Sequence, residues 1–198
     1  MKVLVASRLR ELTNKLLNPI GYKMSRLGLK PNHITIIGFL LGFIIFYFYA
    51  TSQPLLALLA IIISGLMDAL DGAVARASGL TTKFGAVLDA VLDRYVEFFI
   101  IIGIAIGKYA NWLYAFLALF SSIMVSYTRA RAESSGGLKN CAVGIFERQE
   151  RLLTIIIATL ILPFFNYALE IALIIITIFS QITVIQRLHY TWKNANTK

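Results

Sequence analysis

Long apolar stretches alternate with short polar segments along most of the chain. With its flanks, each stretch can supply the roughly 20 residues that a helix needs to cross a bilayer. The pattern therefore predicts an all-α integral membrane protein with six transmembrane helices. The six stretches are Ile34–Ala50, Leu55–Met67, Phe84–Gly107, Trp112–Tyr127, Leu152–Phe165 and Tyr167–Ile185.

The first 30 residues follow a different pattern, in which apolar residues such as Leu9 and Leu12 form a helical stripe opposite charges such as Arg8 and Lys15. Because these charges interrupt any apolar core, the segment is not typical of a signal peptide. We expect an amphipathic juxtamembrane helix on the membrane surface in residues 1–30, followed by the six-helix membrane domain in residues 31–198. A soluble amphipathic turn without lipid contact is the alternative.

Composition agrees with membrane insertion, since 58% of the 198 residues are hydrophobic and the mean hydropathy is +0.75. The formal charge of +9 is concentrated before the first apolar stretch, in the second and fourth connections, and at the C-terminus. The positive-inside rule then predicts a multi-pass cell-membrane protein with both termini and these connections in the cytoplasm. We expect this basic face to meet anionic lipid headgroups or phosphorylated substrates, and no nucleic acid.

Four aspartates interrupt the apolar pattern at the predicted cytoplasmic ends of the second and third spans. Asp68 and Asp71 share one helix face, as do Asp89 and Asp93, because residues three or four apart are neighbours on a helix. Antiparallel packing across the short connection would bring the two pairs together. Clustered carboxylates repel one another unless a cation neutralises them, so the spacing predicts a site for Mg²⁺, Mn²⁺ or Ca²⁺, with room for two ions.

Small residues around the aspartates would leave space for a ligand. Gly72 and Ala75 lie on the face of Asp68 and Asp71, and Gly85 precedes Asp89 by one turn, which favours close helix approach. Arg76 adds a guanidinium suited to binding phosphate.

These positions together complete the pattern DxxDGxxARx8GxxxDxxxD, by which the sequence resembles the CDP-alcohol phosphotransferases. The resemblance implies that an alcohol displaces CMP from a CDP-linked lipid. It also implies that the cofactor is Mg²⁺ or Mn²⁺, bound as two ions, and that the protein forms a homodimer. The implied roles are metal ligands for Asp68, Asp71, Asp89 and Asp93, with Asp93 also the general base, and contacts to the CDP-lipid for Gly72, Ala75 and Arg76.

A second polar cluster carries four arginines around the fourth connection, in "SYTRARAE" and "ERQER". Such a set favours a phosphorylated acceptor, although ordinary positive-inside anchors are the alternative. The cluster is similar to a stretch in phosphatidylinositol phosphate and archaetidylinositol phosphate synthases, which implies inositol 1-phosphate as acceptor. The implied acceptor-phosphate residues are Arg129, Arg131, Arg148 and Arg151.

Several alternatives stay open at this point. Glycerol 3-phosphate or serine transferases share the same core, and the sequence does not distinguish a diacylglycerol lipid from an archaeol lipid. "KPNHIT" has a counterpart in the family, so Asn32 and Thr35 are further candidate contacts to the nucleotide, although Asn32 also suits a helix N-cap. A cation or proton transporter would use intramembrane carboxylates too, and a membrane scaffold would leave both clusters unexplained. Neither Glu97 nor Glu170 has an assigned role.

Overall fold

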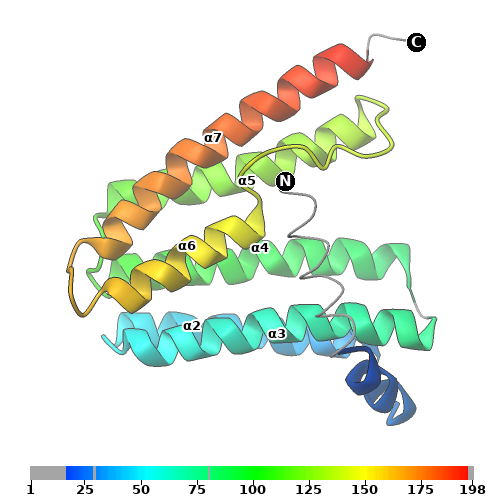
Figure 1. Cartoon of the computed structure of the whole chain (residues 1–198), viewed down its shortest axis with the longest axis horizontal. Helices are drawn as coiled ribbons and strands as arrows, with labels where there is room; N and C mark the ends of the chain where they lie inside the picture. The colour runs from blue at the N-terminus through cyan, green and yellow to red at the C-terminus, as the bar shows by residue number, and fades with distance from the viewer. Residues whose placement is uncertain (1–16, 29, 80, 196–198) are drawn as a thin grey trace. The chain divides into compact units, whose positions relative to one another are not determined.

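The structure is a computed structural model that describes residues 17–28, 30–79 and 81–195. All regular secondary structure in these ranges is helical, which confirms the predicted all-α class (Figure 1). A helix over residues 17–26 comes first. The elements that follow are α2 (Pro31–Ala50), α3 (Pro54–Ser78), α4 (Lys83–Ile106), α5 (Trp112–Ser134), α6 (Arg148–Ile161) and α7 (Ala168–Ala195).

Local signals in the sequence explain where the helices begin. Pro31 and Pro54 are the first residues of α2 and α3, where the missing amide hydrogen of proline removes no helical bond. Asn111 caps α5 by accepting a hydrogen bond from the Leu113 amide. At α6, Glu147 and Glu150 form a reciprocal capping box, which satisfies amide groups that the first turn leaves without helical partners.

Some helices continue beyond the apolar stretches that predicted them. The second stretch ends at Met67, but α3 runs on through the charged motif to Ser78 and stops before Gly79, whose φ is +66°. The fourth stretch ends at Tyr127, whereas α5 extends to Ser134. Hydropathy marks the apolar length of a helix, and good helix formers such as the alanines and arginines of these extensions prolong it into polar surroundings.

Within the described residues, four helices are long and apolar enough to cross a membrane: α2, α3, α5 and α7. Charged residues crowd α4, which contains "DAVLDRYVE". The 14 residues of α6 span roughly 21 Å at 1.5 Å per residue, less than a hydrocarbon core of about 30 Å. The prediction of several membrane-crossing helices is therefore supported, and six spans stay a prediction. The predicted surface helix lies mostly outside the described residues, and its boundary at residue 30 stays a prediction.

Contacts divide the chain into two compact units. The first unit combines Met1–Ile45 with Leu59–Phe99, and the second combines Phe46–Leu58 with Ile100–Lys198.

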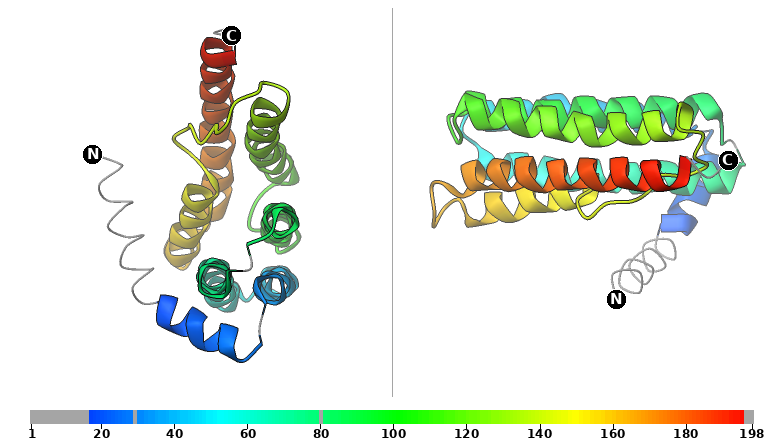
Figure 2. Two further views of the ribbon diagram at one scale, coloured as in Figure 1. Left: turned by 90° about the vertical axis from the view of Figure 1, so that its right-hand side faces the viewer. Right: turned by 90° about the horizontal axis from the view of Figure 1, so that it is seen from above.

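In the first unit, the segments of α2, α3 and α4 lie side by side (Figures 1 and 2). A Cβ on Gly42 of α2 would lie 3.1 Å from the Phe99 ring and 3.3 Å from the Val96 side chain of α4. Phe39 and Phe43 pack edge to face beside this contact. The absence of a side chain at Gly42 thus lets α4 approach α2 closely, which places α4 for the site described below.

In the second unit, α7 packs against both α5 and α6. The Tyr49 hydroxyl and the Thr159 hydroxyl lie 2.7 Å apart and are buried. Glu170 of α7 accepts a hydrogen bond from the Asn111 amide at the start of α5, at 2.9 Å. This bond gives Glu170, which the sequence left without a role, the function of joining two helix starts.

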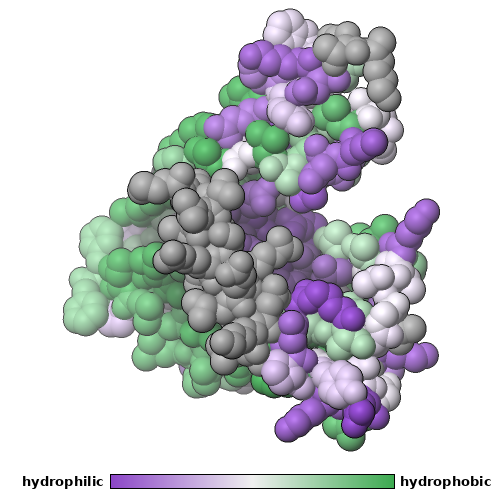
Figure 3. Space-filling view, turned by 45° about the vertical axis from the view of Figure 1, so that its right-hand side comes forward, coloured by the Kyte–Doolittle hydropathy of each residue, from purple (hydrophilic) through white to green (hydrophobic). Residues whose placement is uncertain are grey.

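Hydrophilic and hydrophobic residues separate on the surface. The face drawn in Figure 3 carries hydrophobic residues and hydrophilic residues in separate patches. The hydrophobic residues that are exposed include large side chains such as Phe43, Phe116 and Ile185. Exposed apolar surface on this scale is typical of a protein whose solvent is partly lipid.

Candidate functional site

Three of the four predicted aspartates come together in the first unit. Asp68 and Asp71 on α3 and Asp89 on α4 each offer a carboxylate oxygen, and these oxygens lie within 4.8 Å of one another. All three residues are half-buried. Their convergence follows from the i, i+3 spacing on α3 and the short connection to α4, as the sequence indicated.

Asp93 is not part of this group of three. Its carboxylate lies 3.7 Å from a terminal nitrogen of Arg94, and Arg94 in turn pairs with Glu97 at 3.3 Å. The Glu97 side chain is only 3% exposed, so Arg94 partners a buried carboxylate. Glu97, which had no assigned role, is thus the ion-pair partner of the arginine next to Asp93.

A cavity of about 200 Å³ adjoins the aspartates and has Asp71 and Asp89 in its wall. It is smaller than the roughly 300 to 1,000 Å³ of pockets that enclose a whole small molecule, so it suits one portion of a larger ligand. Four of the five residues predicted to contact the CDP-lipid line it: Asn32, Thr35, Gly72 and Ala75.

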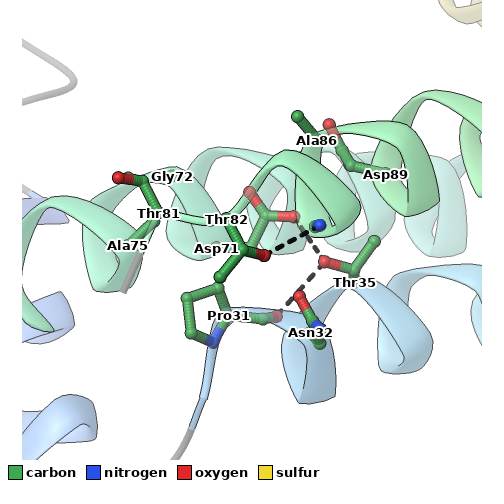
Figure 4. Close-up of a pocket in the computed structure, with 11 residues that line it drawn as sticks. Pro31, Asn32, Thr35, Asp71, Gly72, Ala75, Thr81, Thr82, Ala86 and Asp89 are labelled. Carbon is green, nitrogen blue, oxygen red and sulfur yellow. Dashed lines mark hydrogen bonds between the residues drawn. The ribbon is translucent and has the colours of Figure 1, made fainter. Parts of the chain in front are cut away.

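The wall from α2 is joined to the aspartates directly. The Thr35 hydroxyl donates a hydrogen bond to the Asp71 carboxylate at 3.0 Å (Figure 4). A Cβ on Gly85 of α4 would lie 3.0 Å from the Asn32 amide oxygen and 3.0 Å from the Thr82 hydroxyl. Thr82 accepts a hydrogen bond from the Gly85 amide at 2.9 Å. Gly85 therefore allows α4 to approach α2, and the close approach to α3 that the sequence suggested stays a prediction.

Arg76, the fifth predicted contact, is exposed and is not in the cavity wall. Its guanidinium donates a hydrogen bond to the Asn18 side chain at 3.3 Å. A Cβ on Gly72, one turn earlier, would lie 3.3 Å from another nitrogen of the same guanidinium. Gly72 thus leaves room both for a ligand in the cavity and for the Arg76 side chain folded back along α3.

The four predicted acceptor residues lie in the second unit, in different surroundings. Arg131 is exposed near the end of α5, and Arg129 forms an ion pair with Glu133 at 2.9 Å. Arg148 and Arg151 share the first turn and one face of α6, and Arg151 is only 1% exposed. That these arginines lie beside the aspartates stays a prediction.

Sequence reasoning missed Arg187, which is 2% exposed. Its guanidinium donates to the Val143 carbonyl, the Val125 carbonyl and the Glu147 carboxylate, each at 2.7 Å. These bonds join α7 to α5 and to the segment before α6. The partners are 40 to 62 residues away, so no local pattern pointed to them.

The donor set of the aspartate group fits a divalent metal. Three carboxylate oxygens from two helices converge, and an all-oxygen set is what Mg²⁺ and Mn²⁺ prefer.

A family model described as CDP-alcohol phosphatidyltransferase matches residues 29–184. The chain belongs to this family. It is 42% identical to the archaetidylinositol phosphate synthase of Pyrococcus horikoshii over 183 residues, which cover 92% of this chain and 94% of that protein. The crystal structure of the Mycobacterium tuberculosis phosphatidylinositol phosphate synthase with CDP-DAG bound is similar with a TM-score of 0.83 and 29% identity, covering 93% of this chain and 98% of that one.

The same mycobacterial enzyme in complex with manganese and citrate is similar with a TM-score of 0.82 and 30% identity, covering 92% of each chain. As a CDP-alcohol phosphatidyltransferase, the protein is a transferase of phospholipid biosynthesis, and enzymes of this family use divalent metals. Family membership excludes the transporter and scaffold alternatives.

Proposed function

We propose that this enzyme transfers the lipid phosphate group of a CDP-linked lipid to inositol 1-phosphate and releases CMP. The observation that carries the proposal is the convergence of Asp68, Asp71 and Asp89 beside a cavity lined by residues that the sequence predicts to contact the nucleotide. The choice of acceptor is supported by similarity to synthases named for inositol phosphate products.

In this proposal, Asp68, Asp71, Asp89 and Asp93 hold two divalent ions, Mg²⁺ or Mn²⁺. Bound metal would neutralise the negative charge of the pyrophosphate and of the departing CMP. The three clustered carboxylates provide most of the donor oxygens. Asp93 lies one turn beyond Asp89 on α4 and near Arg94. Its carboxylate is not one of the three clustered carboxylates, and we assign it a second role.

That second role is general base catalysis. Asp93 takes the proton from the attacking hydroxyl of the acceptor, and the hydroxyl oxygen forms a bond to the phosphorus that carries the lipid. The bond from this phosphorus to the bridging oxygen breaks, and CMP leaves with that oxygen. Asn32, Thr35, Gly72, Ala75 and Arg76 bind the CDP moiety and hold the pyrophosphate in place for the attack.

The acceptor phosphate is bound by Arg129, Arg131, Arg148 and Arg151. Guanidinium groups pair with phosphate through two parallel hydrogen bonds, and an uncharged alcohol would gain nothing from such a set. The predicted topology puts these arginines and the aspartates on the cytoplasmic face, where water-soluble inositol 1-phosphate is available. The enzyme works as a homodimer in the membrane.

The test is an assay of the purified enzyme with CDP-archaeol or CDP-diacylglycerol, Mg²⁺ or Mn²⁺, and one acceptor at a time. We expect CMP release with inositol 1-phosphate to exceed release with glycerol 3-phosphate or serine by at least about 100-fold in kcat/KM, because glycerol 3-phosphate lacks the inositol ring and serine lacks both the ring and the phosphate. Faster turnover with glycerol 3-phosphate or serine would contradict the proposed acceptor. Comparison of the two CDP-lipids identifies the donor.

A further inference from the structure

The helix over residues 17–26 packs directly on the part of α3 that carries the motif. Figures 1 and 2 show it in blue, running across α3. Leu17 and Met24 from this helix join the apolar cluster of Ile34, Leu70 and Val74. The predicted amphipathic segment therefore contacts protein through at least part of its apolar face, in a region where we expected a surface helix facing lipid.

Gly21 sets the distance between this helix and the motif. A Cβ at Gly21 would lie 2.8 Å from the Ala73 carbonyl carbon and 2.9 Å from the Ala73 Cβ. Gly21 is not among the glycines with positive φ, so its backbone conformation is open to other residues, and glycine weakens a helix relative to alanine. In the described structure, glycine is required at this position because the helix backbone approaches Ala73 too closely to leave room for a side chain.

Ala73 lies inside the sequence "DGAVAR", between Gly72 and Arg76. Asn18 lies three residues before Gly21 on the same helix. Its side-chain oxygen accepts a hydrogen bond from the guanidinium of Arg76 at 3.3 Å. Asn18 and Arg76 are both exposed. A long side chain on an exposed helix face has many rotamers, and a hydrogen bond to a neighbouring helix reduces their number before a ligand arrives.

We propose that the helix over residues 17–26 positions Arg76 for the CDP-linked lipid, with Gly21 fixing the helix against Ala73 and Asn18 orienting the guanidinium. This inference rests on the proposed function, in which Arg76 contacts the CDP moiety. Asn18 is a positioning residue that acts through Arg76. Asn18 therefore affects the binding of the CDP-linked lipid and leaves the rate of the chemical step unchanged.

The test measures the equilibrium binding of CDP-diacylglycerol to the purified full-length enzyme, by competition with a labelled copy of the same lipid. Asn18→Ala should raise the Kd by about 2-fold to 10-fold, the range that a single hydrogen bond supports. Asn18→Gln retains an amide oxygen and should recover most of the affinity. Ser25→Ala on the same helix is the control for a neutral polar-to-alanine change and should leave the Kd unchanged.

A double mutant decides whether Asn18 acts through Arg76. Arg76→Ala alone should weaken binding, and adding Asn18→Ala to it should have no further effect, because the hydrogen-bond partner is already gone. With saturating CDP-diacylglycerol, kcat of Asn18→Ala should equal that of the unmodified enzyme. Gly21→Val should raise the Kd further than Asn18→Ala, and melting curves recorded beside it identify any loss of fold.

Three results would overturn this inference, and they distinguish it from the proposed function. Weaker binding by Arg76→Ala together with unchanged binding by Asn18→Ala, or additive effects in the double mutant, would remove the positioning role and leave the proposed function intact. Unchanged binding by Arg76→Ala would remove the nucleotide contact assigned to Arg76, and the inference with it.

Discussion

Thr35 of α2 donates a hydrogen bond to the carboxylate of Asp71 on α3, with 3.0 Å between the two oxygens. The same hydroxyl lies 3.2 Å from the Pro31 carbonyl oxygen one turn earlier. Thr35 thus links the first residues of α2 to a carboxylate of the candidate metal group. A hydroxyl in this position fixes the orientation of the carboxylate and the direction of its free lone pairs.

Replacing Thr35 by valine should therefore weaken metal binding by about 10-fold, the lower end of the range for partners of metal ligands. Valine retains the branched shape and removes only the donor. Mn²⁺ binding to the purified enzyme, measured by calorimetry in the absence of substrates, checks this directly. Thr35→Ser keeps the hydroxyl and serves as the matched control, and equal affinities for the valine and serine variants would exclude the orienting role.

Asp93→Asn should abolish turnover while CDP-lipid binding remains within about 2-fold of the unmodified enzyme. The amide has a similar size and keeps one oxygen that can face a metal ion, but it accepts no proton at neutral pH, so the step that needs a base is the one that is lost. Asp71→Ala is the comparison, because it removes both oxygens of one of the three clustered carboxylates and should impair metal binding as well as turnover. Normal turnover of Asp93→Asn would remove Asp93 as the base.

Arg148→Ala should raise the KM for the acceptor at least about 10-fold more than the KM for the CDP-lipid, because a guanidinium to phosphate pair is lost. Arg148 is preferable to Arg151 for this test, since Arg151 is 1% exposed and its truncation would also disturb packing. Steady-state kinetics with each substrate varied in turn gives both constants. Equal increases in the two KM values would count against a dedicated phosphate site.

Arg187→Met should destabilise the protein by about 3 to 5 kcal/mol, the usual result of removing one member of a buried charged network. Two backbone carbonyls and Glu147 would lose their donor. Thermal unfolding in detergent measures the change. Glu147→Gln is the milder partner variant, since its side chain is 42% exposed, and it should cost less than half as much. Similar stability of Arg187→Met and the unmodified protein would contradict the structural role.

Features encoded by local spacing could be predicted from the sequence. The all-α class follows from the apolar stretches, and the grouping of Asp68, Asp71 and Asp89 follows from helical periodicity across one short connection. Periodicity also placed Asp93 with them, but the structure puts its carboxylate beside Arg94 and outside the group of three.

Contacts between distant segments could not be predicted in the same way. Thr35 and Asp71 are 36 residues apart, and Asn18 and Arg76 are 58 apart. Such pairs depend on how helices cross, which is set by close approaches such as Gly21 against Ala73 and Gly42 against Phe99. A glycine inside a helix pattern signals that a close approach exists, but it does not name the partner.

The most direct test of the account is the transfer of labelled inositol 1-phosphate into the lipid-extractable fraction by the purified enzyme with a CDP-lipid and Mn²⁺. The account predicts label in lipid in a one-to-one ratio with released CMP, and neither product with Asp93→Asn or after removal of metal by a chelator. CMP release without label in the lipid fraction, or label transfer that persists in Asp93→Asn, would contradict it.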